Sequence, residues 1–330
     1  MIRLLKVELT RLRWRRVVVV LLAAAIVVPV VIFIAVAYET RPVSDAEQAE
    51  VAEMVREETA APRTQRQLAR CLRSPERYGV AGGDDTQQGC EDAVLPRAEW
   101  FSDRPQLDLR QEVKEGAGIG VVAVLAVLML LIGTTFVGHD WNTGSMGNQL
   151  LFESRRTRVW TAKAVAVLGV GLVVSGLVLF SYWGGLLALA HQRDLPVPDG
   201  VVNDVYAQAL RGTLLAGLAG LGGYVITMLF RSTVATLGIL FAVAVAVPVL
   251  FSLFTFPGHL SLQPQNNGWA LIRGGVELTD YDDEKCWEDP ANTEGCIVEI
   301  TTADASIYTG SLLVAVGVPS LLLYRRRDVP

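Results

Sequence analysis

Between two long apolar runs the chain reads GHDWNTGSMGNQLLFESRRTRVWTAK at residues 138–163. The flanking runs, 116–138 and 164–191, contain no Asp, Glu, Lys or Arg. A helix needs about 20 mainly apolar residues to cross a bilayer, so the quoted segment is expected to connect two membrane-spanning helices. It carries large apolar side chains at Trp141, Met146, Leu150, Leu151 and Phe152. A water-facing connection does not need them, so they indicate a segment that docks into a groove on another protein.

Four further charge-free runs raise the number of predicted spans to six. These runs are 17–38, 212–230, 232–272 and 305–324. The lipid interior offers no other partner to backbone polar groups, so each run is expected to be helical. The run at 232–272 is too long for one span, and its second part contains two prolines. We assign that part to a re-entrant or interfacial hairpin. The predicted fold class is an all-α integral membrane protein with six transmembrane helices.

The predicted segment order follows from these runs. The spans are placed at 17–38, 116–138, 159–190, 211–230, 234–255 and 305–324. Before them, 1–16 is predicted to be an amphipathic interfacial helix, from the spacing of Ile2, Leu5, Leu9 and Leu12. The connections are an extracytoplasmic subdomain at 39–115, a loop at 139–158, an outer loop at 191–210, an inner turn at 231–233, a hairpin with an outer loop at 256–304, and a tail at 325–330. The first span is read as an uncleaved anchor, because its apolar run exceeds the length typical of a signal peptide.

The distribution of charge sets the expected orientation. With the N-terminus inside, the inner segments hold 14 of the 29 Lys and Arg and only 4 of the 34 Asp and Glu. Inner loops of membrane proteins carry such a basic excess. We therefore expect a multi-pass protein of the cell membrane with both termini cytoplasmic. The basic run before the first span abuts the membrane, so a nucleic-acid partner is not expected.

All four cysteines fall in the predicted outer segments, where an oxidising environment favours disulfides. Three pairings are possible. Cys71–Cys90 and Cys286–Cys296 are favoured because each pair lies within one loop. A metal site is the alternative, but the sequence lacks paired C-x-x-C spacing.

The outer segments carry two further local patterns. Ser44 and Glu47 form a capping-box pattern before a helix-forming run. The acidic residues at 280–284 could bind calcium, but the EF-hand spacing is absent, so a solvated loop is the better interpretation.

No pattern for catalysis is present. The chain has no P-loop, G-x-S-x-G or H-E-x-x-H sequence. Its three histidines lie in separate connections. The span interiors contain no ionisable machinery, since Lys163 and Arg211 lie near span ends, which argues against an ion-coupled carrier. We expect a non-catalytic protein whose energy comes from another subunit.

The segment at 139–163 resembles the first inner loop of permease subunits of ABC-2 type transporters. That loop commonly reads as an acidic residue, Gly-Thr, apolar residues, an Arg, and a Lys seven residues later. Here Asp140 stands where Glu is usual, and Gly144-Ser145 stands for Gly-Thr. Arg156 and Lys163 keep the spacing of seven. Residues 228–239 are similar to the family's inner turn between spans four and five. The subdomain at 39–115 is long for the family.

The resemblance implies a dimer of permeases with two ATPase subunits. The second permease is a copy or a homologue, and ATP and Mg²⁺ are bound by the ATPases, with no cofactor on this chain. The loop would act as a coupling helix seated in an ATPase groove. Its expected anchors are Trp141, Met146 and Leu150, and the residues that set its orientation are Asp140, Glu153, Arg155 and Arg156. Gly144 and Ser145 complete the predicted site. The alternative is that the loop lies on the membrane with its arginines at lipid headgroups.

The family likeness also implies a substrate path along spans two and five. Its candidate residues are Gly118, Gly120, Gly133, Phe241, Phe251 and Phe254. Ordinary packing of small residues between helices is the competing interpretation.

The function expected from the sequence is the membrane subunit of an ATP-driven exporter for an amphipathic or apolar cargo such as a lipid, drug or antimicrobial peptide. The alternative is a membrane sensor or scaffold whose outer subdomain binds a ligand or partner.

Overall fold

The computed structural model describes residues 1–330 apart from 81–85, 102–104, 255, 257, 281–295 and 327–330. The chain divides into two compact units. We name the part made of Met1–Ile34 and Asp108–Pro330 the membrane unit, and Ala35–Leu107 the disulfide unit.

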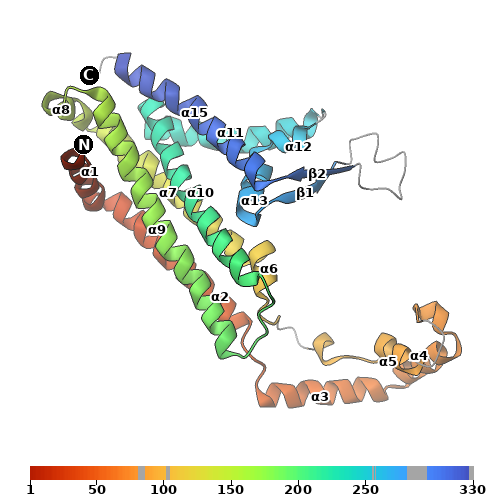
Figure 1. The fold of residues 1–330 in the computed structure, drawn as a ribbon. Coiled ribbons are helices and arrows are strands. Elements are labelled where there is room, and N and C mark those ends of the chain that lie inside the picture. The colour runs from red at the N-terminus through yellow and green to blue at the C-terminus, as the bar shows by residue number, and fades with distance from the viewer. Residues whose placement is uncertain (81–85, 102–104, 255, 257, 281–295, 327–330) are drawn as a thin grey trace. The chain divides into compact units, whose positions relative to one another are not determined.

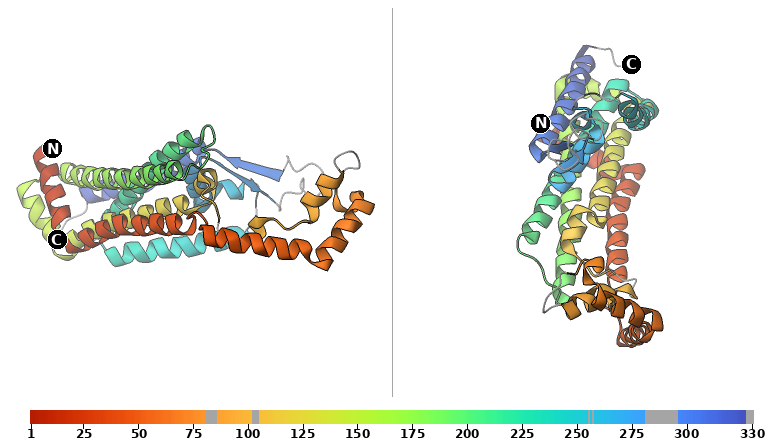
Figure 2. Two further views of the ribbon diagram at one scale, coloured as in Figure 1. Left: turned by 90° about the horizontal axis from the view of Figure 1, so that it is seen from below. Right: turned by 90° about the vertical axis from the view of Figure 1, so that its right-hand side faces the viewer.

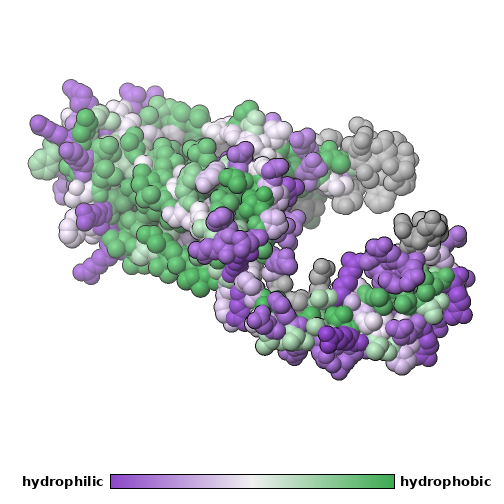
Figure 3. Space-filling view, turned by 60° about the horizontal axis from the view of Figure 1, so that its bottom comes forward, coloured by the Kyte–Doolittle hydropathy of each residue, from purple (hydrophilic) through white to green (hydrophobic). Residues whose placement is uncertain are grey.

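Six helices are long and apolar enough to cross a membrane, which confirms the predicted number of candidate spans. They are α2 (Arg16–Glu39), α7 (Ala117–Asn142), α9 (Arg156–Gln192), α10 (Val201–Phe230), α11 (Thr233–Leu253) and α15 (Thr302–Arg326). A short helix, α6 (Leu109–Lys114), precedes α7. In Figure 3, hydrophobic residues cover much of the membrane unit, as a lipid-facing surface requires.

The spans differ in how closely they pack. Helix α10 lies against α7 and α9, and these three helices form the packed centre of the membrane unit. Gly133 of α7 allows this close approach, because a Cβ there would lie 2.0 Å from the carbonyl oxygen of Gly220 in α10. Helices α2, α11 and α15 are much less buried, and each contains an interior proline: Pro29, Pro248 and Pro319.

Helix α10 begins at Val201, ten residues before the start predicted from charge. Its first turns hold Asp204 and Arg211, which ended the apolar run, but Val205 and Ala209 on the same segment are buried. The side chain of Gln208 is also buried and donates to the carbonyl of Val113 at 2.7 Å. Tertiary packing therefore extends the helix beyond the charge-free run.

The predicted all-α class needs a correction between α11 and α15. The described chain there forms α12 (His259–Leu262), α13 (Pro264–Arg273) and an antiparallel pair of strands, β1 (Val276–Thr279) and β2 (Ile297–Ile300). The strands place β-branched residues opposite one another, as in the pair Val276 and Ile300. Ile300 packs with Ala270 and Ala305 in a small core. The sheet escaped prediction because each strand has only four residues.

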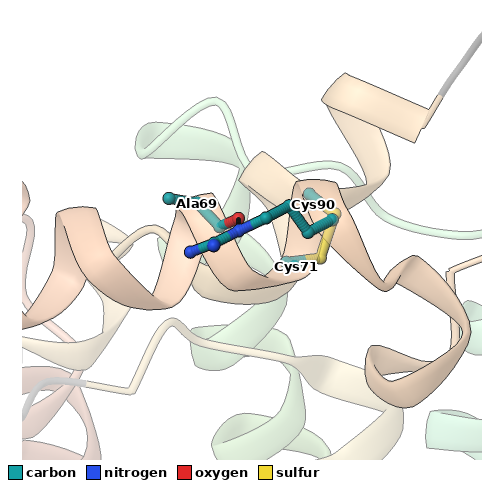
Figure 4. Close-up of a disulfide and its surroundings, with 4 residues drawn as sticks. Ala69, Cys71 and Cys90 are labelled. Atoms are coloured by element: carbon teal, nitrogen blue, oxygen red, sulfur yellow. Dashed lines mark hydrogen bonds between the residues drawn. A yellow bond between two sulfur atoms is a disulfide. The ribbon is translucent and has the colours of Figure 1, made fainter.

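The disulfide unit is built from α3 (Asp45–Ala60), α4 (Pro62–Arg73) and α5 (Thr86–Val94), with 3₁₀ turns at Pro75–Tyr78 and Ala98–Trp100. The predicted capping box is confirmed, since Ser44 and Glu47 bond reciprocally at the start of α3. The Cys71–Cys90 disulfide is also confirmed and joins α4 to α5 (Figure 4). The predicted Cys286–Cys296 bridge and most of the acidic stretch at 280–284 lie outside the described residues.

Candidate functional site

Five elements meet at one end of the membrane unit: α1 (Ile2–Trp14), the end of α7, α8 (Ser145–Phe152), the start of α9 and the end of α15 (Figures 1 and 2). We call this region the α8 end. Gly144, between α7 and α8, has a φ of 67°, which glycine adopts without steric cost. The chain can therefore leave α7 and enter α8 within two residues.

Charged side chains from separate helices meet inside the α8 end. The ammonium of Lys163 in α9 lies 2.7 Å from Oε2 of Glu8 in α1 and 2.7 Å from Oδ2 of Asp140 in α7. Arg15, which joins α1 to α2, pairs with the other oxygen of Asp140. Glu8, Asp140 and Lys163 are fully buried. The two cations balance the two carboxylates, which is required because an unpaired buried charge is strongly destabilising. We call Glu8, Arg15, Asp140 and Lys163 the ionic cluster.

The inner face of α8 is bonded directly to the ionic cluster. The Ser145 hydroxyl donates to Oδ1 of Asp140 at 2.6 Å. The Gln149 side-chain amide donates to Glu8, and its oxygen accepts from Arg11 at 3.0 Å. Every oxygen of the Glu8 and Asp140 carboxylates therefore accepts a hydrogen bond. These bonds hold α8 in one orientation against α1 and α7.

A second set of contacts ties the end of α7 and the start of α8 to the end of α15. The rings of Trp141 and Tyr324 meet edge to face, with centroids 6.2 Å apart. The guanidinium of Arg231 lies 4.8 Å from the centroid of the Trp141 ring. Met146 is almost fully buried, and its sulfur accepts from the Tyr324 hydroxyl at 3.4 Å. Trp141 and Met146, expected as anchors for a partner, thus make contacts within this chain.

The outer end of α8 presents two large apolar side chains to the surroundings. Leu151 is 82% exposed and Phe152 is 94% exposed, whereas Leu150 is half-buried. Leu151 and Phe152 come directly after the part of α8 that bonds to the ionic cluster through Ser145 and Gln149. The helix therefore combines an immobilised face with an exposed apolar tip.

The charged residues after α8 occupy different positions. Arg155 is exposed, and Glu153 is half-buried. Arg156 begins α9 and donates to the carbonyl of Tyr324 at 3.3 Å. Of the predicted orienting residues, Asp140 is bound inside the chain and Arg156 is partly bound to α15. Arg155 lies on the surface.

The residues predicted for a substrate path do not form one surface in this chain. Gly118 and Gly133 lie at close contacts of α7 with Trp183 and Gly220, whereas a Cβ on Gly120 would meet nothing within 4 Å. On α11, Phe241 is exposed, and Phe251 lies 6.0 Å from Phe256 between ring centroids. Phe254, just after α11, is exposed as well.

Sequence reasoning missed the ionic cluster. Two features were visible: Glu8 is the only acidic residue among the first 16, which contain six Lys and Arg, and Lys163 stands alone at the start of an apolar run. A lone charge of this kind beside a span calls for a buried partner, although the sequence does not say which residue supplies it.

Among the residues that the structure describes, no group of three or more His, Cys, Asp and Glu side chains is arranged to hold a metal ion. No family model, curated protein or solved structure matched the chain.

Proposed function

We propose that this chain is the permease subunit of an ABC-2 type exporter. It would move an amphipathic or apolar cargo with energy from ATP that is hydrolysed, with Mg²⁺, on a separate subunit. One observation carries the proposal: α8 is bonded along one face to the ionic cluster and exposes Leu151 and Phe152 at its tip. Six apolar candidate spans are consistent with a transport protein.

The tip of α8 is the part suited to bind the ATPase. A few well-packed residues at the centre of an interface, often aromatic, commonly supply most of its binding energy. Leu151 and Phe152 take this role in place of Trp141 and Met146, whose side chains contact Tyr324. The exposed Arg155 lies nearby in sequence and suits the polar rim of such an interface.

The ionic cluster supplies a route by which a force on α8 reaches the spans. Ser145 connects α8 to α7 through Asp140, and Gln149 connects it to α1 through Glu8. Lys163 bonds both carboxylates and so adds α9. Packed and ion-paired elements of this kind move as rigid bodies. A displacement of α8 by ATPase closure would therefore shift α1, α7 and α9 together.

Helix α11 is suited to contact a second permease. Most of its surface is exposed, including Phe241 at 72% and Leu253 at 70%. An exposed apolar helix at the edge of a helix bundle faces either lipid or another protein. We assign it to the second permease copy or homologue.

The test begins with the tagged full-length protein in its native cells, cross-linked and purified with any bound P-loop ATPase. We expect an ATPase to co-purify. Replacing Leu151 and Phe152 with Ala should weaken its binding by about thirtyfold or more, since losing a buried anchor commonly costs ~2 kcal/mol. The control is Ile307→Ala with Leu312→Ala, two exposed apolar residues of α15, which should leave ATPase binding unchanged.

Two results would contradict the proposal. Recovery of the folded protein without any ATPase would favour the alternative, a membrane sensor or scaffold whose disulfide unit binds a ligand. Equal ATPase binding by the α8 variant and the α15 control would show that the tip of α8 is not the docking site.

A further inference from the structure

A groove runs between α2 and α9 in the membrane unit. Its walls come from residues 26–33 of α2 and residues 174–185 of α9, and its volume is about 370 Å³. This size falls within the ~300–1,000 Å³ of ligand pockets in proteins. The groove lies far along both helices from the α8 end, so it belongs to no part of the site described above.

Sparse packing of α2 creates the groove. Most of this helix is exposed, and it approaches α9 closely near Phe33. There, the Phe33 ring meets Tyr182 edge to face at 6.3 Å between centroids. A Cβ on Gly185 would lie 2.9 Å from the Phe33 ring. These contacts close one end of the groove, while its side remains open toward the surroundings.

The chemistry of the walls favours an apolar occupant. The lining residues are apolar apart from Ser181 and Tyr182, and none carries a charge. Water needs two to four polar partners to occupy a site stably, and this groove does not supply them along its length. An empty groove would forfeit the dispersion contacts of its walls.

The length of the groove can be compared with the thickness of a bilayer. Residues 174 and 185 of α9 are eleven residues apart, which is about 16 Å at 1.5 Å per residue. The hydrocarbon core of a bilayer is about 30 Å thick, so the groove is about half as long as the core is thick. On α2 it is lined from Ile26 to Phe33, around the middle of that helix.

We propose that this groove binds one acyl chain of a bilayer lipid. Open access from the side, uncharged and mainly apolar walls and a length of about half the hydrocarbon core fit a hydrocarbon chain lying along the helices. The proposal does not depend on the exporter assignment, because a lipid chain can bind without nucleotide or partner.

The experiment uses the full-length protein in nanodiscs of phosphatidylcholine, with a phosphatidylcholine probe that carries a photoactivatable diazirine in its acyl chain. No nucleotide or ATPase is added. After illumination, mass spectrometry should locate cross-links within residues 26–33 and 174–185. Labelling there should exceed labelling of the exposed apolar surface of α11 around Phe241 at the same fraction of probe, because a bound chain stays in the groove whereas loosely contacting lipid exchanges.

A matched pair of variants tests the location. Val178→Trp places a large ring in the groove wall and should reduce groove labelling at least tenfold. Val173→Trp changes the same residue type on the same helix at an exposed position outside the groove and should leave it unchanged. Equal labelling in both variants would overturn the proposal. If Val178→Trp does not yield folded protein, the unmodified protein decides: equal labelling of the groove and of the exposed surface of α11 would reject a defined site.

Discussion

The α8 end and the disulfide unit use oppositely charged side chains at nearly the same distance but in different surroundings. Lys163 lies 2.7 Å from Glu8 with both side chains fully buried. In the disulfide unit, Arg63 lies 2.8 Å from Glu58, but the two side chains are 73% and 30% exposed. Water and salt screen the exposed pair, whereas the buried pair has no substitute for its partner. Equal geometry therefore predicts unequal consequences of mutation.

The largest effect is expected from Lys163→Met. This change leaves buried Asp140 with Arg15, and buried Glu8 with only the more distant Arg11 at 3.9 Å. Breaking a buried pair typically costs about 3–5 kcal/mol. The loss of stability is measured by thermal unfolding of the purified protein. Size-exclusion chromatography then shows whether the protein still elutes as a single peak. Lys114→Met, which removes an exposed lysine, is the control and should change little.

Adding Glu8→Gln to Lys163→Met should recover part of that stability, because Asp140 then keeps Arg15 as a balanced partner. A double-mutant cycle reports this coupling. If the two substitutions simply added, the charges would not interact as the distances indicate.

The second effect concerns the covalent link in the disulfide unit. Cys71→Ser removes a cross-link between α4 and α5, and loss of a native disulfide in a small domain typically costs about 2–5 kcal/mol. Limited proteolysis should cleave within Ala35–Leu107 faster, while the membrane unit stays protected. Unchanged protection would mean that packing alone holds the unit. Non-reducing peptide mapping should recover the Cys71–Cys90 pair, and the Cys286–Cys296 pair remains a prediction for the same experiment.

A smaller effect is expected at the start of α3. Ser44→Ala removes the side chain that accepts from the Glu47 backbone N–H, and such caps contribute about 1 kcal/mol. Proteolysis near residue 44 should accelerate modestly, and Ser44→Asp, which also caps helices, should restore protection. Equal cleavage of all three proteins would show that the cap does not limit opening of this segment.

The smallest effect is expected from Arg63→Gln. The hydrogen bond from Arg63 holds the pKa of Glu58 below its ordinary value, against a smaller opposing effect of burial. A lowered folded-state pKa stabilises the fold above the ordinary carboxyl pKa, and this contribution is lost as the pH falls through the lowered value. Both groups are in contact with water, so the variant should be nearly as protease-resistant as the original protein at neutral pH. A loss comparable to that of Lys163→Met would refute the distinction between the two regions.

Local features of the fold were predictable from the sequence, whereas long-range contacts were not. The spans follow from apolar length, and the Ser44 cap and the Cys71–Cys90 bridge follow from residues close together in the chain. The ionic cluster joins Glu8 to Lys163, which are 155 residues apart in sequence, and no local pattern specifies that pairing. The sequence also did not indicate which side of α8 faces the rest of the protein. Met146 and Phe152 are both large and apolar, yet Met146 is buried and Phe152 is exposed.

The three interior prolines bear on how the protein adapts to membranes of different thickness. Pro29, Pro248 and Pro319 each follow an alanine by four residues, at Ala25, Ala244 and Ala315. A proline has no N–H to bond the carbonyl four residues before it, so each helix can bend there at reduced cost. All three prolines lie in the thinly packed spans, while the central α7, α9 and α10 have none. A mismatch between protein and bilayer can be absorbed by bending or tilting. We therefore expect the outer helices to flex as lipid composition changes, while the central three keep a constant geometry.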